Sequence, residues 1–80
     1  MSTLFDEDAR LVGTLHSVRF EADGGDWHVA SVDTRRGRIT VVGNLAGAAP
    51  GEGLQLRGAW VQDPKYGRQF RVKDAVAVPP

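Results

Sequence analysis

Short runs of β-branched and aromatic residues, separated by Gly, Asp and Pro, recur along this sequence and limit what it can fold into. No apolar repeat of helical period extends beyond a turn or two, so the pattern predicts strands rather than helices. Five strands are expected, at residues 11–20, 27–33, 38–43, 54–61 and 69 to about 73. Leu54, Leu56 and Trp60 alternate on one face of the fourth strand, which places Trp60 in the core. The same phase argument places Phe70 of the fifth strand in the core.

Two irregularities accompany these strands. Leu15 and Val18 are three residues apart in the first strand, which indicates a bulge or a bend of the kind that closes a small barrel. The third and fourth strands are joined by the small-residue segment 44–53, which has room for at most one short helical turn. Asp74 would fall on the inner face if the fifth strand continued. Regular pairing is therefore expected to end near it, with 75–78 forming at most a last edge segment.

Five short strands, a bulged first strand and a long connection before the fourth together predict an all-β fold, the five-stranded OB-fold barrel. An SH3-like barrel is the alternative, although chains of that type usually place their long loops earlier. The expected layout is a frayed or disordered N-terminus at residues 1–10, the OB-fold barrel at 11–78 and the start of a linker at 79–80.

The composition sets further limits. A chain of 80 residues without cysteine builds one small domain and has no disulfide or cysteine-based metal site. No apolar run approaches the roughly 20 residues that a membrane helix needs. The N-terminal acids Asp6, Glu7 and Asp8 do not suit a signal peptide. A soluble cytoplasmic monomer without a membrane partner is expected.

The net charge is zero, which does not favour a strongly basic nucleic-acid binder, but the charges are unevenly distributed. Residues 1–34 contain seven acids and two bases, a balance of −5, and residues 35–80 contain eight bases and three acids, a balance of +5. The asymmetry is compatible with one basic face, and equally with scattered charges, because sequence halves need not correspond to faces.

Motifs of catalysis are not evident. Gly24 and Gly25 lack the following Lys and helix of a phosphate-binding loop. His16 and His28 are too few for a metal site and are interpreted as ordinary strand residues. The acids cluster in turns and at the N-terminus, where solvated charge is the usual state. We expect no catalytic residues, no cofactor and no metal in this chain.

Binding is the remaining function. OB barrels bind single strands across strands two and three, between the loop joining strands one and two and the loop joining strands four and five. The loop joining strands four and five supplies Lys65, Tyr66 and Arg68. Of these, Tyr66 is the best candidate for base stacking. Asp63, Pro64 and Gly67 around them suit a type I turn followed by a residue with positive φ. The third strand and its leading turn add Arg36 and Arg38. The loop joining strands one and two is acidic and would repel phosphate, which argues against these nucleic-acid contacts. Trp27, which follows this loop, is interpreted as a core or barrel-end residue.

Several segments together resemble one known family. They are Gly13-x-Leu15-x-x-Val18-x-Phe20, Val41-Val42-Gly43-Asn44-Leu45, Pro50-Gly51-Glu52, Gly58-x-Trp60 and Pro64-Lys65-Tyr66-Gly67-Arg68-Gln69-Phe70. The chain resembles, from about Leu11 to Val72, the N-terminal OB-fold domain of RecD-like (YrrC-type) ATP-dependent DNA helicases. The last of these segments is fairly specific, whereas the others alone are common in OB folds.

The resemblance implies a β-barrel module placed ahead of motor domains that bind ATP and magnesium and translocate 5′ to 3′ on single-stranded DNA in repair and recombination. None of the motor motifs is present here. The resulting hypothesis is a non-catalytic accessory module that binds or guides single-stranded DNA. The alternative is a protein-docking module that contacts the motor domains or a repair partner, which net neutrality and the acidic loop favour. An RNA-binding OB domain is a third, weaker possibility.

Overall fold

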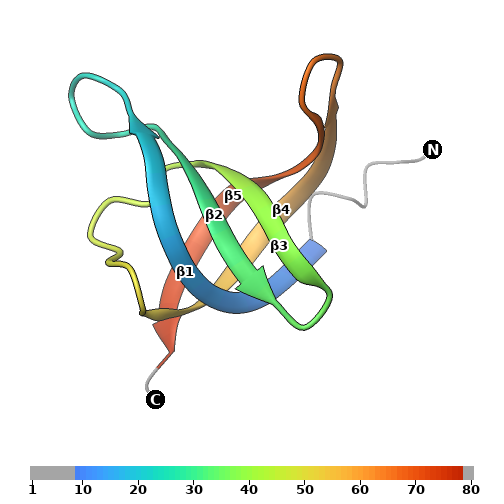
Figure 1. The fold of residues 1–80 in the computed structure, drawn as a ribbon. Helices are drawn as coiled ribbons and strands as arrows, with labels where there is room; N and C mark the ends of the chain where they lie inside the picture. Colours follow the sequence, from blue (N-terminus) through green and yellow to red (C-terminus); the bar gives the residue numbers. More distant parts are fainter. Residues whose placement is uncertain (1–8, 79–80) are drawn as a thin grey trace.

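Five strands and their connections make up the part of the chain, residues 9–78, that the computed structural model describes. The strands are β1 (Ala9–Glu21), β2 (His28–Thr34), β3 (Gly37–Gly43), β4 (Gly53–Asp63) and β5 (Gly67–Val78). They close into a barrel in the order β1-β2-β3-β5-β4, and β1 also pairs with β4 (Figure 1). Every neighbouring pair is antiparallel except β3 and β5. This topology confirms the predicted OB-fold barrel over the SH3-like alternative.

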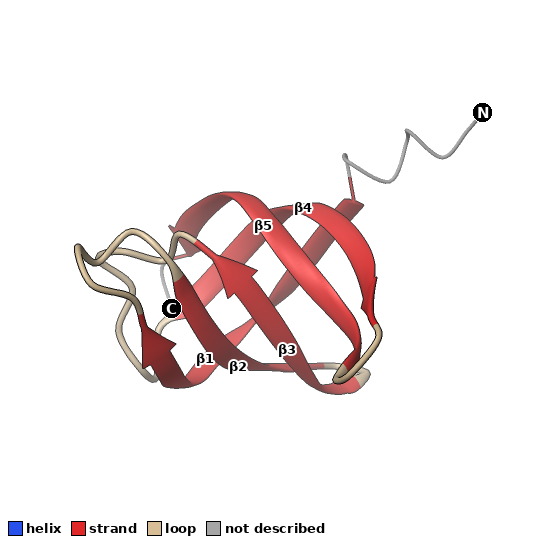
Figure 2. Ribbon diagram, turned by 90° about the horizontal axis from the view of Figure 1, so that it is seen from above, coloured by secondary structure: helices blue, strands red, loops and turns tan. Residues whose placement is uncertain are grey.

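The barrel interior holds a single apolar core. Figure 2 shows the strands wrapped into the barrel, with the longer loops at one end. The buried members of the core are Leu15, Ala30, Val32, Val41, Leu45, Leu54, Leu56 and Phe70. Phe70 is completely buried, and the ring of Trp60 packs edge-on against it at 5.1 Å between centroids. Both residues therefore face the core as the alternation of β4 and β5 predicts.

β1 is bulged, as the spacing of Leu15 and Val18 predicts. The pairing of β1 with β2 shifts between Leu15 and Ser17 and again between Val18 and Phe20. Each shift inserts one residue and reverses the inward–outward phase of the strand. The two shifts bend β1 enough for its first half to pair with β4 and its second half with β2. They also leave the ring of Phe20 paired with Val29 on the outside of the barrel, 55% exposed.

β5 is longer than expected: regular pairing with β4 continues past Asp74 to Val78. Arg57 pairs with Asp74 and Gly58 pairs with Val72, so Lys73 is an extra, bulged residue. This bulge reverses the phase of β5 and turns Asp74 outward, where its carboxylate lies 2.6 Å from the guanidinium of Arg57. The strand can therefore continue to Val78 without burying a charge.

The connection between β3 and β4 contains turns and no helix. It is attached to the barrel through His28, which is buried at the start of β2. The backbone N–H of Leu45 donates a hydrogen bond to Nδ1 of His28 at 3.0 Å. Nδ1 is therefore the unprotonated nitrogen, and Nε2 faces the carboxylate of Glu21 at 3.6 Å. His28 fixes the loop whose Leu45 side chain caps the core.

Replacing His28 with Ala should destabilise the domain by about 1–3 kcal/mol, because the buried N–H of Leu45 loses its acceptor. His16→Ala is the control: this imidazole is exposed, and its removal should change the free energy of unfolding by less than about 0.5 kcal/mol. Urea denaturation of the two variants measures the difference. Equal stability of the two variants would contradict the structural role of His28.

Candidate nucleic-acid interface

Three exposed aromatic side chains surround one groove on the outside of the barrel. They come from the end of β1 (Phe20), the β1–β2 loop (Trp27) and the β4–β5 turn (Tyr66). The remaining lining residues of this aromatic groove, which has a volume of about 680 Å³, are Arg19, Val29, Thr40, Val42, Asp63 and Gln69. In Figure 1 the β1–β2 loop (cyan) and the β4–β5 turn (orange-brown) project beyond the barrel on either side of β2 and β3.

Alternation along β2 and β3 produces the floor of the aromatic groove. Ala30 and Val41 point into the core and are fully buried, so the residues next to them point outward. Val29 and Val42 form a cross-strand pair in this outward row, and both line the groove, with Val42 only 7% exposed. Because Phe20 pairs with Val29 from the other side, the row continues onto β1. The floor is therefore an apolar surface of three adjacent strands.

The turn between β4 and β5 holds Tyr66 at the edge of the groove. A carboxylate oxygen of Asp63 accepts hydrogen bonds from the backbone N–H groups of Lys65 and Tyr66, each at 2.8 Å. Gly67 follows with φ of +82°, which an L side chain rarely adopts. The predicted turn chemistry of Asp63 and Gly67 is thus present. Its effect is to present the phenol ring of Tyr66, 68% exposed, to solvent.

Trp27 does not lie where the sequence predicts it. It precedes β2, lies outside any strand and is 39% exposed. Its place in the wall of the aromatic groove contradicts its interpretation as a core or barrel-end residue. The physical reason is that β2 starts at His28, which takes the buried position. The acidic loop therefore contributes an aromatic ring to the groove, whereas none of its carboxylates is among the lining residues.

The cationic residues predicted to bind nucleic acid are distributed over two surfaces. Lys65 accompanies Tyr66, with its ammonium 5.3 Å from the centroid of the phenol ring. Arg36 and Arg68 instead line a different cleft, beside Trp60, and share no wall with the groove. Arg38 lies on the outward face of β3, and its guanidinium donates to the carboxylate of Asp33 at 2.7 Å. Of the predicted contacts, only Tyr66 lines the groove.

The ion pair with Arg38 changes the titration of Asp33. The hydrogen bond from Arg38 is the largest influence and holds the pKa of Asp33 below its ordinary value of 3.8. Desolvation opposes this shift, and the positive charges of Arg38 and His16 add to it. Because the folded-state pKa is lowered, the stabilisation from this carboxylate is fully present above pH 3.8 and is lost as pH falls through the folded-state pKa. Arg38→Gln should return the pKa of Asp33 toward 3.8. NMR titration of the Asp33 carboxyl carbon in the wild type and in the Arg38→Gln variant tests this expectation, and identical titration curves would contradict it.

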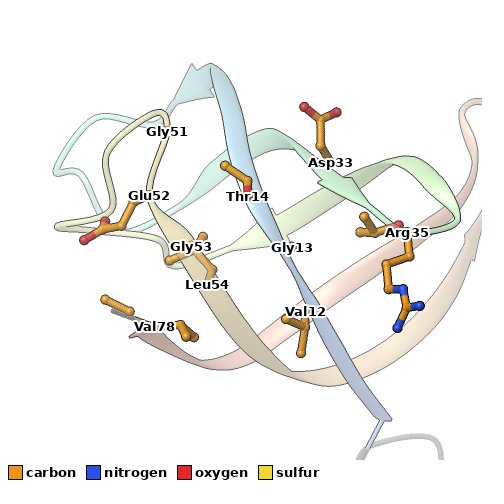
Figure 3. A pocket seen from close by; sticks show the side chains of 12 residues that line it. Val12, Gly13, Thr14, Asp33, Arg35, Gly51, Glu52, Gly53, Leu54 and Val78 are labelled. Atoms are coloured by element: carbon orange, nitrogen blue, oxygen red, sulfur yellow. The ribbon is translucent and has the colours of Figure 1, made fainter. Parts of the chain in front are cut away.

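A second hollow, the apolar hollow, lies between β1, the end of β5 and the loop before β4, and has a volume of about 910 Å³ (Figure 3). Figure 3 shows Glu52 and Arg35 at opposite ends of it, with Val12, Leu54 and Val78 between them. Glu52 accepts a hydrogen bond from the backbone N–H of Ala49 at 3.0 Å, so its carboxylate supports the local loop. This hollow presents no exposed aromatic ring for stacking.

Within residues 9–78, no three His, Asp or Glu side chains gather in a way that could hold a metal ion. His16 and His28 face different carboxylates, those of Asp33 and Glu21. The described strands and loops include no helix long and apolar enough to cross a membrane.

Comparison with known proteins gives one clear result. Residues 8–80 match the family model described as the ATP-dependent DNA helicase YrrC, OB-fold domain. The match covers the whole barrel, including the β1–β2 loop and the β4–β5 turn that border the aromatic groove. A search of curated proteins finds no match.

Proposed function

Because the chain belongs to the family of OB-fold domains of the ATP-dependent DNA helicase YrrC, we propose that it is a non-catalytic accessory module that binds and guides single-stranded DNA. The aromatic groove is the proposed binding surface. In this proposal ATP and magnesium act in the motor domains, and the barrel itself needs no cofactor. The module would contribute to DNA repair or recombination by holding the strand on which the motor translocates.

The observation that supports this proposal most is the position of the three aromatic rings. Phe20, Trp27 and Tyr66 come from three separate segments, and all line the face over β2 and β3 on which OB barrels bind single strands. Exposed aromatic rings are costly in water and are the groups on which bases stack, at about 1–3 kcal/mol per base. Arg19 and the nearby Lys65 supply positive charge for the phosphates.

A fluorescence anisotropy titration with labelled oligothymidylate, at two salt concentrations, tests the proposal. Binding should be detectable at low salt and should weaken as salt rises, because phosphate contacts release counterions. Stacking should leave a residual affinity at the higher salt concentration. Absence of binding at low salt would overturn the proposal.

One observation favours the alternative, a protein-docking module. The aromatic groove is largely apolar, and among its lining residues Arg19 is balanced by Asp63. A docked segment of a motor domain or repair partner would bury the three rings and would bind with little salt dependence. Binding of single-stranded RNA as tightly as DNA of equal length would instead support the RNA-binding alternative.

A further inference from the structure

A cleft at the edge of the barrel collects four arginine side chains. Arg10 comes from the start of β1, Arg35 and Arg36 from the β2–β3 turn, and Arg68 from the start of β5. The other lining residues of this arginine cleft, which has a volume of about 550 Å³, are Leu11, Val12, Thr34, Ile39 and Trp60. Figure 1 shows the start of β1 (blue) and the β2–β3 turn (green) on the side of the barrel away from the cyan β1–β2 loop.

Among residues 9–78, no acidic side chain neutralises the charge of the arginine cleft. None of its described lining residues is acidic. Within residues 9–78, ion pairs occupy Arg38 and Arg57, and none involves the four arginines of the cleft. Four exposed guanidinium groups around one concave surface repel one another, and they are stable together in water chiefly because the solvent screens them. An anionic ligand would remove this repulsion.

The chemistry of the cleft selects phosphate among anions. Guanidinium groups have a planar set of donors that matches phosphate oxygens in pairs. The floor of the cleft is the indole of Trp60 with Leu11 and Ile39. The guanidinium of Arg68 lies over this indole at 4.2 Å from the ring centroid, which holds it at the cleft edge. A ligand with phosphates and an organic body satisfies both parts of the surface.

The arginine cleft and the aromatic groove lie on opposite faces of the same strands. On β3, Ile39 lines the cleft and the next residue, Thr40, lines the groove; on β5, Arg68 and Gln69 are divided in the same way. Consecutive strand residues point to opposite sides, so the two surfaces are separated by about the thickness of one strand. A single strand that leaves the groove and passes over β3 and β5 near Thr40 and Gln69 would reach the cleft directly.

We propose that the arginine cleft is a second nucleic-acid site, which binds the phosphodiester backbone of the single strand where it continues beyond the aromatic groove. This inference rests on the proposed function. It makes the binding site of the domain longer than the groove alone, toward the upper part of the range of about 4–16 nucleotides that single OB folds cover.

Two lengths of oligothymidylate, about 5 and about 15 nucleotides, test the inference with the double variant Arg35→Gln and Arg36→Gln. The variant should bind the longer strand about tenfold more weakly at low salt, with a salt slope reduced by about 1.4 for two lost phosphate contacts. It should bind the shorter strand with wild-type affinity, because that strand fits in the groove. The control, Arg57→Gln with Arg71→Gln, has the same net charge and lies outside both surfaces.

The outcomes separate this inference from the proposed function. If the Arg35 and Arg36 double variant binds the longer strand with wild-type affinity, the arginine cleft is not a nucleic-acid site. An equal loss of affinity in the control variant would lead to the same conclusion. An equal loss for both lengths would also overturn this inference, since the cleft would then not extend the groove. Unchanged binding by a Tyr66→Ala variant would overturn the groove while leaving the effect of the arginines intact. Failure of the wild type to bind either length would overturn both.

Discussion

Substitution of Gly58 by Ala should destabilise the barrel by at least about 3 kcal/mol, a large part of the roughly 4–12 kcal/mol expected for 80 residues. Gly58 faces inward beside the β4–β5 bulge, where the two strands approach closely. A methyl group there would collide with the backbone carbonyl oxygen of Arg71 and lie 2.9 Å from its carbonyl carbon and 3.1 Å from the backbone nitrogen of Lys73. Backbone atoms cannot move aside by changing a rotamer, so β4 and β5 would have to separate.

Thermal denaturation followed by circular dichroism measures this effect, and the melting temperature should fall by at least about 12 °C. Gly53→Ala is the matched control on the same strand. Its added methyl would lie 3.3 Å from the carbonyl oxygen of Val78, and φ of Gly53 is not positive, so a cost below about 1 kcal/mol is expected. If the two variants have the same melting temperature, β4 and β5 do not approach each other as closely at Gly58 as described.

Replacing Trp27 and Tyr66 together with Ala should weaken binding of single-stranded DNA by at least about 30-fold. Each ring lines the aromatic groove and is exposed, so each can stack on one base for about 1–3 kcal/mol. Two lost stacks therefore cost about 2–6 kcal/mol, and 1.4 kcal/mol corresponds to about tenfold in affinity. Anisotropy titration of the double variant gives the ratio of dissociation constants.

Conservative substitutions separate stacking from other effects of the same positions. Trp27→Phe and Tyr66→Phe retain a ring at each site and should remain within a few-fold of wild type. Val76→Ala removes exposed apolar surface outside the groove and should leave affinity unchanged. Neither aromatic ring packs in the core, so thermal stability should change little in any of these variants. Equal affinity of the double Ala variant and the wild type would show that the rings do not stack on bases.

The sequence predicts those parts of the fold that depend on simple alternation. Leu54, Leu56 and Trp60 on β4 fall on the inner face as expected, and so does Phe70 on β5. The first bulge is visible as the spacing of Leu15 and Val18. Positions after a second irregularity are not predictable in this way, because each bulge reverses the phase of the strand. The continuation of β5 past Asp74 depends on the extra residue Lys73, which no local pattern marks.

The candidate site follows the same rule. Tyr66 is predictable because Asp63 and Gly67 fix its turn, and both roles can be seen in the sequence. Phe20 and Trp27 depend on the phase after two bulges and on where β2 starts, so their common groove emerges only in three dimensions. Arg68 is next to Gln69 in the sequence, yet strand alternation sends the two side chains to opposite faces.

The most direct test of binding in the aromatic groove is an NMR titration with an oligothymidylate of about 5 nucleotides. The protein has two tryptophans, and their indole N–H signals report on different surfaces, Trp27 on the groove and Trp60 on the arginine cleft. If the oligonucleotide binds in the aromatic groove, the Trp27 signal should shift, together with amides of β2, β3 and the β4–β5 turn, while the Trp60 signal stays in place. A stationary Trp27 signal at saturating oligonucleotide would contradict binding in the groove.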